Sequence, residues 1–335
     1  MIDFKILLFM LYNYFAPLLC GLLFMIPMCI SRLFNNNYIA IRIKNIIFIS
    51  VGYILRTVFN IKFYTNSTKL VKKIFENDKQ VIITQNHLTE FDSLFYYALF
   101  DNNLNSSYNS ITLMKKAVAY QLLGVGIIDF FGNDVFLSRN IIRDSNNLNN
   151  ISKNNNAIYL FPEGTVFTKE TKNKSDIFSR SQNLPIYEYV LYPRVTGISM
   201  IIKNNNIKTL YDITTMFDTI KKKDFGTYFS AQYFLLNGLP KNVVFNITKY
   251  SINSEIINKK AEEIFKNKDK FIKKFNNNFK DYKPINFAFD DGLYSLVIVI
   301  LFSICSLYLY IEYTPIRYLF LSELIGFLFY LHIFY

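Results

Sequence analysis

The fold is decided by the stretch Val81-Ile82-Ile83-Thr84-Gln85-Asn86-His87-Leu88-Thr89-Glu90-Phe91-Asp92. Its first residues are apolar or β-branched, and this pattern predicts a buried strand over 81–85. The residues that follow, from Ser93 to Phe100, are apolar enough to predict a helix packed on a sheet. A polar corner between a strand and a helix is where α/β folds usually keep their chemistry, because it is held rigidly and faces a crevice.

His87 is the best candidate for a general base near neutral pH. The chain has 2 histidines, and the other, His332, lies in an apolar segment near the C-terminal end. Asp92 can meet His87 only if the histidine lies in the corner before the helix, where the carboxylate would fix the imidazole tautomer. No serine or cysteine is evidently paired with these two residues. The proton would therefore come from a substrate hydroxyl, in a direct transfer without a covalent enzyme intermediate.

Charge is distributed unevenly along the 335 residues. Hydrophobic residues make up 51% of the chain, and the stretches 6–31 and 293–311 contain no charged side chain. This pattern predicts an integral membrane protein with one polar domain between hydrophobic ends. The net charge of +12 favours anionic lipid surfaces and anionic substrates. No groove-reading motif is present, so nucleic acid is not expected as a partner.

The hydrophobic pattern divides the chain into N-terminal membrane-anchoring helices, an α/β domain and a C-terminal transmembrane helical hairpin. The expected bounds of these parts are 1–60, 61–285 and 286–335. Within the α/β domain, the pattern predicts helices over 68–76, 116–123 and 254–278. Strand-like runs cover 81–85, 111–114, 127–137, 157–161, 189–195, 207–217, 227–235 and 243–252. Strands alternating with helices predict a sheet flanked by helices, with antiparallel additions in the strand-rich later part.

The hydrophobic ends differ in how clearly they predict membrane spans. The block 6–30 is long enough to cross a bilayer with tilt or a bend at a proline, and a cleaved signal peptide is the alternative. The run 46–59 contains Arg56, which favours a helix in the interface or the return arm of a hairpin. The runs 293–311 and 316–335 would form the C-terminal hairpin around a charged proline turn.

A second polar corner is Leu160-Phe161-Pro162-Glu163-Gly164-Thr165, where another predicted strand runs into a turn. Glu163 could hold a substrate hydroxyl, and Gly164 would let the backbone approach a ligand closely. Taken alone, this sequence is also an ordinary turn. The 3 cysteines lie in apolar segments without metal-ligand spacing, so no metal site is predicted.

The two corners together resemble the glycerolipid acyltransferase family, membrane enzymes that acylate lysophosphatidic acid and other lysophospholipids from acyl-CoA. The first family motif, Asn-His with an Asp five residues after the His, is matched by Asn86, His87 and Asp92. The third, Phe-Pro-Glu-Gly-Thr, is matched without a break at 161–165. The resemblance implies that His87 and Asp92 are catalytic. It implies substrate binding by Asn86 and by Glu163, Gly164 and Thr165.

Weaker motifs extend the resemblance. The run 136–139 is similar to the second motif, whose arginine, here Arg139, is implied to meet substrate phosphate. Arg194 lies in a proline-bearing run similar to the fourth motif, and Lys116 matches a basic position that precedes the second. One departure concerns the residue after Phe-Pro-Glu-Gly-Thr. Many members have a phosphate-binding arginine there, and this chain has Val166.

The resemblance predicts an acyltransferase that transfers a fatty acyl chain from acyl-CoA to the free hydroxyl, at sn-2, of a lysophospholipid. The expected acceptor is 1-acyl-sn-glycerol-3-phosphate, which would give phosphatidic acid. A diester acceptor such as lysophosphatidylinositol is the alternative, and a non-catalytic membrane lipid-binding protein is another. The expected partners are acyl-CoA as co-substrate, the lysophospholipid and the bilayer, with no separate cofactor. Cations flanking the hydrophobic blocks, namely Arg32, Arg42, Lys44, Lys280 and Lys283, predict a domain facing the cytosol, on the endoplasmic reticulum.

Overall fold

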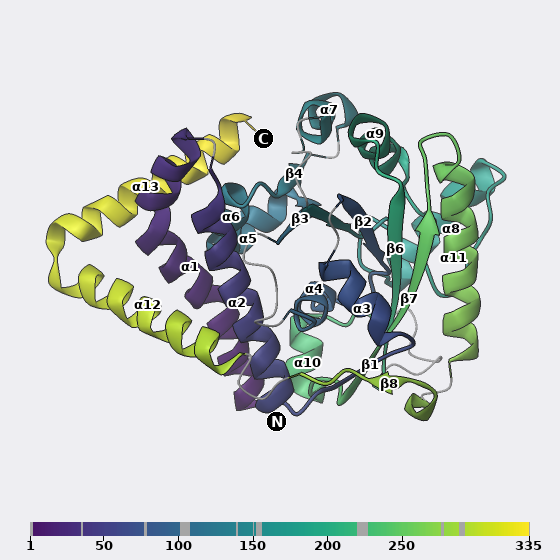
Figure 1. Ribbon diagram of the computed structural model, residues 1–335, viewed down its shortest axis with the longest axis horizontal. Helices are drawn as coiled ribbons and strands as arrows, with labels where there is room; N and C mark the ends of the chain where they lie inside the picture. Colours follow the sequence, from purple (N-terminus) through teal and green to yellow (C-terminus); the bar gives the residue numbers. More distant parts are fainter. Residues whose placement is uncertain are drawn as a thin grey trace.

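The computed structural model shows one sheet with helices around it (Figure 1). It describes residues 3–34, 36–76, 79–100, 108–138, 140–149, 151, 156–219, 227–275, 278–287 and 292–334. The sheet has 8 strands in the order β4-β3-β5-β2-β6-β7-β1-β8. Their bounds are β1 Lys62–Thr65, β2 Val81–Gln85, β3 Asn109–Lys115, β4 Val135–Leu137, β5 Asn156–Leu160, β6 Thr209–Phe217, β7 Asn242–Ser251 and β8 Lys283–Pro284. The predicted α/β class, with a sheet flanked by helices, is confirmed.

Strand β2 lies inside the parallel half of the sheet. It pairs in parallel with β5 on one side and with β6 on the other, and all five of its residues are buried. Strand β7 runs antiparallel to β6, and β8 runs antiparallel to β1, which supplies the expected antiparallel additions. Because β2 and β5 are parallel neighbours, their carboxyl ends meet at one edge of the sheet. The two polar corners of the sequence therefore lie side by side.

The helices inside the domain follow the sequence pattern only in part. Helices α3 and α11 lie within a few residues of their predicted bounds. The helices are α3 Thr68–Phe75, α4 Asp92–Tyr97, α5 Lys116–Gln121, α6 Leu123–Phe131, α7 Ile141–Asn149, α8 Lys169–Ser181, α9 Thr196–Asn205, α10 Ala231–Asn237 and α11 Ile257–Lys274.

Three strand predictions were wrong. The run 127–137 is the end of α6 followed by the short strand β4, and 227–235 leads into α10. The run 189–195 forms a loop, whose backbone N–H groups bond to side chains of other segments rather than to a neighbouring strand.

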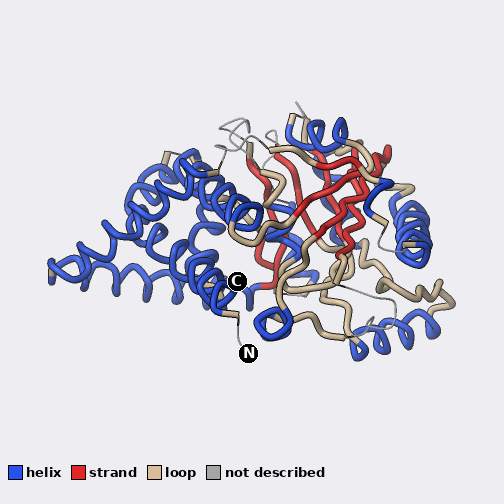
Figure 2. Tube along the Cα trace, turned by 90° about the horizontal axis from the view of Figure 1, so that it is seen from below, coloured by secondary structure: helices blue, strands red, loops and turns tan. Residues whose placement is uncertain are grey.

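Four apolar helices lie on one side of the sheet domain, as the ribbon diagram and the Cα tube show (Figures 1 and 2). They are α1 Phe4–Leu33, α2 Tyr38–Thr57, α12 Leu293–Glu312 and α13 Thr314–Phe334. Within the described residues, α1, α2 and α12 are long and apolar enough to cross a membrane. Helix α2 begins eight residues before the predicted run 46–59, and most of its residues are buried inside the fold. By contrast, most residues of α12 are exposed.

Buried contacts join α1 and α2 to the sheet domain. Lys44 on α2 is 1% exposed, and its Nζ lies 2.5 Å from Asp134 and donates to the Ser110 carbonyl at 2.8 Å. At Gly124 the helices α1 and α6 cross so closely that a Cβ would lie 2.1 Å from the backbone nitrogen of Leu18. The hydrophobic core is therefore continuous from the sheet into these helices.

Candidate active site

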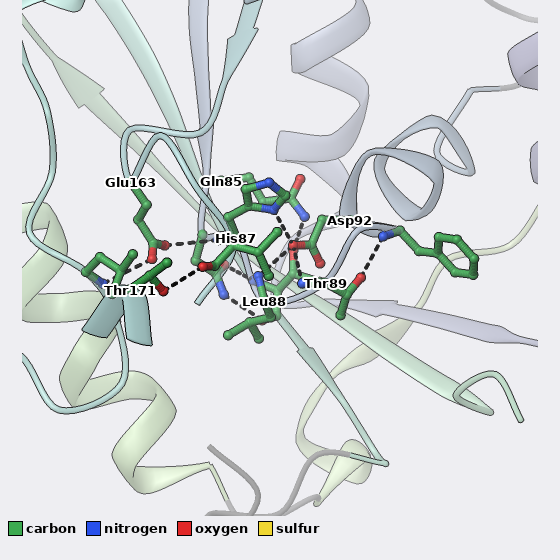
Figure 3. A network of polar contacts seen from close by, with 12 residues as sticks. Gln85, His87, Leu88, Thr89, Asp92, Glu163 and Thr171 are labelled. Atoms are coloured by element: carbon green, nitrogen blue, oxygen red, sulfur yellow. Dashed lines mark hydrogen bonds and ion pairs between the residues drawn. The ribbon is translucent and has the colours of Figure 1, made fainter. Parts of the chain in front are cut away.

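His87 lies in the corner between β2 and α4, where its ring can reach the first residue of the helix (Figure 3). Its Nδ1 is 3.0 Å from Oδ2 of Asp92. The same oxygen accepts the backbone N–H groups of Leu88 at 2.6 Å and Thr89 at 2.9 Å. The backbone of the corner therefore holds the Asp92 carboxylate in place. His87 and Asp92 therefore meet as predicted, with the histidine in the corner before the helix.

Asp92 is fully buried, and its environment acts on its charge in two directions. Burial raises the pKa of Asp92, while the His87 contact and the two backbone N–H groups lower it. A carboxylate beside Nδ1 favours the tautomer that carries its proton on Nδ1, and it stabilises the imidazolium. This arrangement leaves Nε2 with its lone pair available as a base.

The imidazole of His87 has one covered face and a free nitrogen. Phe161 stacks on the ring with 4.0 Å between centroids and an interplanar angle of 15°. The side chain is 19% exposed, and Nε2 makes no hydrogen bond within the described part of the chain. Phe161 therefore limits ring rotation, while Nε2 stays accessible to a ligand.

Glu163 binds two backbone N–H groups at the corner. Its Oε1 accepts the backbone N–H of His87 at 3.0 Å, and its Oε2 accepts the backbone N–H of Leu191 at 3.0 Å. Burial is the main cause that raises the pKa of Glu163 to about 8, and the two N–H groups act against it. Both oxygens are engaged by protein, so the geometry gives Glu163 a positioning contact to His87. The predicted bond to a substrate hydroxyl would have to share an oxygen with a backbone amide.

The turn after Glu163 has a conformation that favours glycine. Gly164 has φ +68°, in the left-handed region, and its N–H bonds to the Phe161 carbonyl at 2.9 Å. The side chain of Arg194 lies across this glycine, with Cδ 3.5 Å from the point where a Cβ would stand. Thr165 and Val166 follow in the same turn and are half-buried. Arg194 therefore places its cation beside Gly164, two residues before Val166 in the chain.

Asn86 holds the strand end to its neighbour. It is 0% exposed, its Nδ2 donates to the Thr215 carbonyl at 3.1 Å, and its Oδ1 accepts the Thr215 N–H at 2.7 Å. Gln85 adds a bond to the Thr215 hydroxyl at 2.8 Å. Asn86 therefore fixes the register of the corner on β6. Its buried amide is bonded to protein at both ends, whereas the motif implied a contact with substrate.

Of the two predicted phosphate ligands away from the corner, one is described. Lys116 begins α5 and is half-buried, and Arg139 lies outside the described residues. Burial lowers the pKa of Lys116, and the charge of Arg143 on α7 lowers it further. The sequence analysis missed Arg143, which has no motif around it. Like charges brought close together favour an anionic ligand between them.

Other contacts of the site carry no local sequence signal. The Phe167 N–H donates to the His87 carbonyl at 2.7 Å, and Leu191 reaches Glu163 through its backbone alone. Backbone partners place no constraint on side-chain type, so only the fold could reveal them. Among the described residues, no group of three or more His, Cys, Asp or Glu side chains is arranged to hold a metal ion.

Comparison with known proteins shows what this arrangement is similar to. Residues 63–212, which run from β1 into β6 and include both corners, match the family model described as Acyltransferase. The match covers a little under half of the chain. His87, Asp92 and Glu163 all lie inside the matched residues, and the Leu191 amide that Glu163 accepts lies there too.

Two relatives and one solved structure give the range of similarity. Lysocardiolipin acyltransferase 1 of Gallus gallus is 28% identical over 187 residues, covering 52% of this chain and 46% of that protein. Lysophosphatidylinositol acyltransferase 10 of Caenorhabditis elegans is 32% identical over 192 residues, covering 53% and 46%. The chain thus matches just under half the length of these relatives. The 1-acyl-sn-glycerophosphate (LPA) acyltransferase of Thermotoga maritima aligns with 80% of this chain and 96% of its own, at 17% identity and a TM-score of 0.47.

Proposed function

We propose that the protein transfers a fatty acyl chain from acyl-CoA to the free sn-2 hydroxyl of a lysophospholipid. One observation carries this proposal. Within the acyltransferase domain, Asp92 holds His87 by Nδ1 at 3.0 Å, and Nε2 remains free at the end of β2. A base held in this way can take a proton from a hydroxyl that attacks a thioester.

The reaction needs only one proton shuttle. The hydroxyl proton passes to Nε2 of His87 as the oxygen attacks the thioester carbonyl carbon. The C–S bond then breaks, and the sulfur takes the proton back from the imidazolium and leaves as the thiol of coenzyme A. Asp92 stabilises the imidazolium between these steps. General-base catalysis of this kind contributes about 10²–10⁴ in rate.

The preferred acceptors are lysolipids whose headgroup phosphate is a diester. Val166 stands where many members of the family carry a phosphate-binding arginine. Relatives of the chain are named for lysocardiolipin and for lysophosphatidylinositol, whose phosphates are diesters. The expected acceptor 1-acyl-sn-glycerol-3-phosphate, a monoester, is the second candidate. Arg194 beside Gly164, and Lys116 with Arg143, are the cations that we propose for the headgroup of either acceptor.

The apolar helices agree with a membrane location, because both the lysolipid and the acyl product partition into bilayers. We propose the endoplasmic reticulum, with the acyltransferase domain in the cytosol where acyl-CoA is available. Lys280 and Lys283, which lie in the domain shortly before α12, support this orientation.

The test is an acceptor panel with purified protein and labelled acyl-CoA. Lysophosphatidylinositol, monolysocardiolipin, lysophosphatidylcholine and lysophosphatidic acid are compared at equal surface concentration. The proposal predicts labelled diacyl product with an equal amount of released coenzyme A thiol, and faster turnover with a diester acceptor. Binding of lysolipid without release of thiol from any acceptor would indicate a lipid-binding protein instead.

A further inference from the structure

The corner between β2 and α4, residues 86–92, is called the catalytic corner below. The segment 227–238, which contains α10, is joined to it at three consecutive residues. Thr89 pairs with Phe229 in a parallel β-bridge. Glu90 accepts the Tyr228 hydroxyl at one oxygen and the Ala231 backbone N–H at the other, the latter at 2.8 Å. The next residue, Phe91, stacks on Phe234 with 5.2 Å between centroids. The acyltransferase mechanism uses none of these contacts.

The same segment is tied to the beginning of the first apolar helix. The backbone N–H of Asp3, the N-cap residue of α1, donates to the Leu235 carbonyl at 3.0 Å. Figure 1 shows α10 beside this end of α1 and next to α4. Helix α1 is a candidate membrane span by length and composition. The 227–238 segment therefore joins the beginning of this candidate span to the catalytic corner.

The outward side of the segment is apolar. On a helix, residues two apart point about 200° away from each other. Phe234 is 1% exposed against Phe91, and Leu236 is accordingly turned away and 55% exposed. At the start of α1, Phe4 is 66% exposed and Leu8 is 50% exposed. These side chains belong to two backbone segments that a hydrogen bond holds together, and α1 is of a length and composition that lipid covers.

We propose that the 227–238 segment is a membrane-contacting wall of the active site. Leu236 enters the boundary between headgroups and acyl chains at the level of Phe4, and the segment guides the lysolipid from the bilayer to His87. Glu90 is the positioning residue that holds this wall on the catalytic corner. The inference rests on the proposed function only for the identity of the guided lipid, because contact with the bilayer does not depend on turnover.

The membrane contact can be measured directly because the chain contains 0 tryptophans. Leu236→Trp, Phe4→Trp and Ile177→Trp each give a single-tryptophan protein, and Ile177 on α8 is the matched control because it is 57% exposed and apolar. The three full-length proteins are reconstituted into phosphatidylcholine vesicles, with and without phosphatidylcholine brominated near the ester end of its acyl chains. The proposal predicts strong quenching for Leu236→Trp and Phe4→Trp, and little for Ile177→Trp. Quenching of Leu236→Trp no stronger than that of Ile177→Trp would overturn it, whether or not the protein transfers acyl groups.

The role of Glu90 is tested by kinetics on vesicles. Glu90→Ala removes both acceptor oxygens, and we expect KM for vesicle lysolipid to rise about tenfold, as the loss of a charge-assisted hydrogen bond would cause. We expect kcat and KM for acyl-CoA to stay within about twofold. Glu90→Gln keeps one acceptor and should lie between. A fall in kcat with unchanged lysolipid KM would overturn the positioning role, because a residue needed only for folding or chemistry gives that pattern.

Discussion

At the scale of single residues, the catalytic corner depends on side chains that bind backbone rather than substrate. One oxygen of Asp92 accepts two backbone N–H groups and contacts the His87 ring, and Glu163 accepts the backbone N–H of His87. The Asn86 side chain makes two hydrogen bonds with the backbone of Thr215 on β6. These bonds fix His87 on three sides, so that a loop residue acquires the rigidity of the sheet. Motif residues can thus be required for catalysis without touching the acceptor.

Glu163 makes the stability of the protein depend on pH. Its pKa is raised to about 8, so ionising the buried carboxyl opposes folding. The folded state then binds more protons than the unfolded state, and stability falls as pH rises from the usual pKa of glutamate to about 8. Glu163→Gln cannot ionise. We expect the apparent Tm of the wild-type protein to fall relative to that of Glu163→Gln between pH 6 and about pH 9, by an amount equivalent to about 1–3 kcal/mol.

Thermal unfolding in one detergent at several pH values checks this difference. Parallel curves for the two proteins would contradict the raised pKa. Although Glu163→Gln should be the more stable protein at high pH, its activity should be lower. The amide offers an acceptor to one backbone N–H and leaves the other facing its NH₂ group. The variant should therefore be slower at every pH.

Val166 sets the expected preference for diester acceptors. An arginine fork would meet a monoester phosphate with paired charge-assisted bonds, and valine offers none. One such contact is worth about 1.5–3 kcal/mol, or one to two decades in affinity. Val166→Arg should therefore raise kcat/KM for lysophosphatidic acid relative to a diester lysolipid by about tenfold or more.

Val166→Gln is the matched control for that measurement, because it lengthens the side chain without adding charge. An equal shift in both variants would show that size, not charge, sets the preference. A wild-type enzyme already selective for the monoester by about a hundredfold would show that Arg194, Lys116 or Arg143 has taken over the contact.

At the scale of secondary-structure elements, close backbone contact joins the apolar helices to the domain. A Cβ at Gly124 would lie 2.1 Å from the Leu18 nitrogen and 2.6 Å from the Pro17 carbonyl carbon, so α1 and α6 can cross here only without a side chain. Gly124→Ala should force the helices apart. We expect a destabilisation of about 1–3 kcal/mol and a lower apparent Tm.

Gly197→Ala controls for the change in helix propensity. Gly197 lies in α9, and its Cβ would be 3.6 Å from the nearest atom, a methyl carbon of Leu148. That substitution should leave stability unchanged or raise it by up to about 1 kcal/mol. If Gly124→Ala proved as harmless as Gly197→Ala, the tight crossing of α1 and α6 would be wrong.

The sequence predicted the elements whose pattern is strong and local. Strand β2 begins with three consecutive β-branched apolar residues, Val81, Ile82 and Ile83, and it lies in the middle of the sheet, so this run was predicted correctly. The run 227–235 is rich in aromatic residues, which favour strands, but here Phe229 and Phe234 pack on the catalytic corner and Ser230 caps a helix. Tertiary contacts decided that segment. The pairing of His87 with Asp92 followed from spacing, whereas Arg143 and the Leu191 amide could be found only from the fold.

At the scale of the whole molecule, the apolar helices lie on one side of the sheet domain (Figure 1). Lys44, expected as a flanking cation, is instead buried against Asp134, so it does not count toward the charge argument for a cytosolic domain. A cytosolic domain predicts that its glycosylation sequences stay unmodified in eukaryotic microsomes. They begin at Asn66, Asn105, Asn150, Asn173 and Asn246.

Asn173 is the most informative of these sites, because it is exposed on α8. The measurement is the mass of the protein made with microsomes, before and after glycosidase treatment. A glycosidase-sensitive shift that Asn173→Gln reduces would place the domain in the lumen and reverse the orientation.

The most direct test of the central claim is acyl transfer by purified His87→Ala and Asp92→Asn beside the wild-type protein, with labelled acyl-CoA and the best acceptor of the panel. Circular dichroism and vesicle binding verify that each variant is folded and membrane-bound. We expect His87→Ala to lose essentially all turnover, because the other histidine of the chain, His332, lies in α13 and not at the corner. We expect Asp92→Asn to keep a residual rate, since the base remains while its tautomer preference weakens. Retention of more than about one per cent of wild-type turnover by folded His87→Ala, beyond the 10²–10⁴ range of general-base catalysis, would contradict the assignment of His87 as the base.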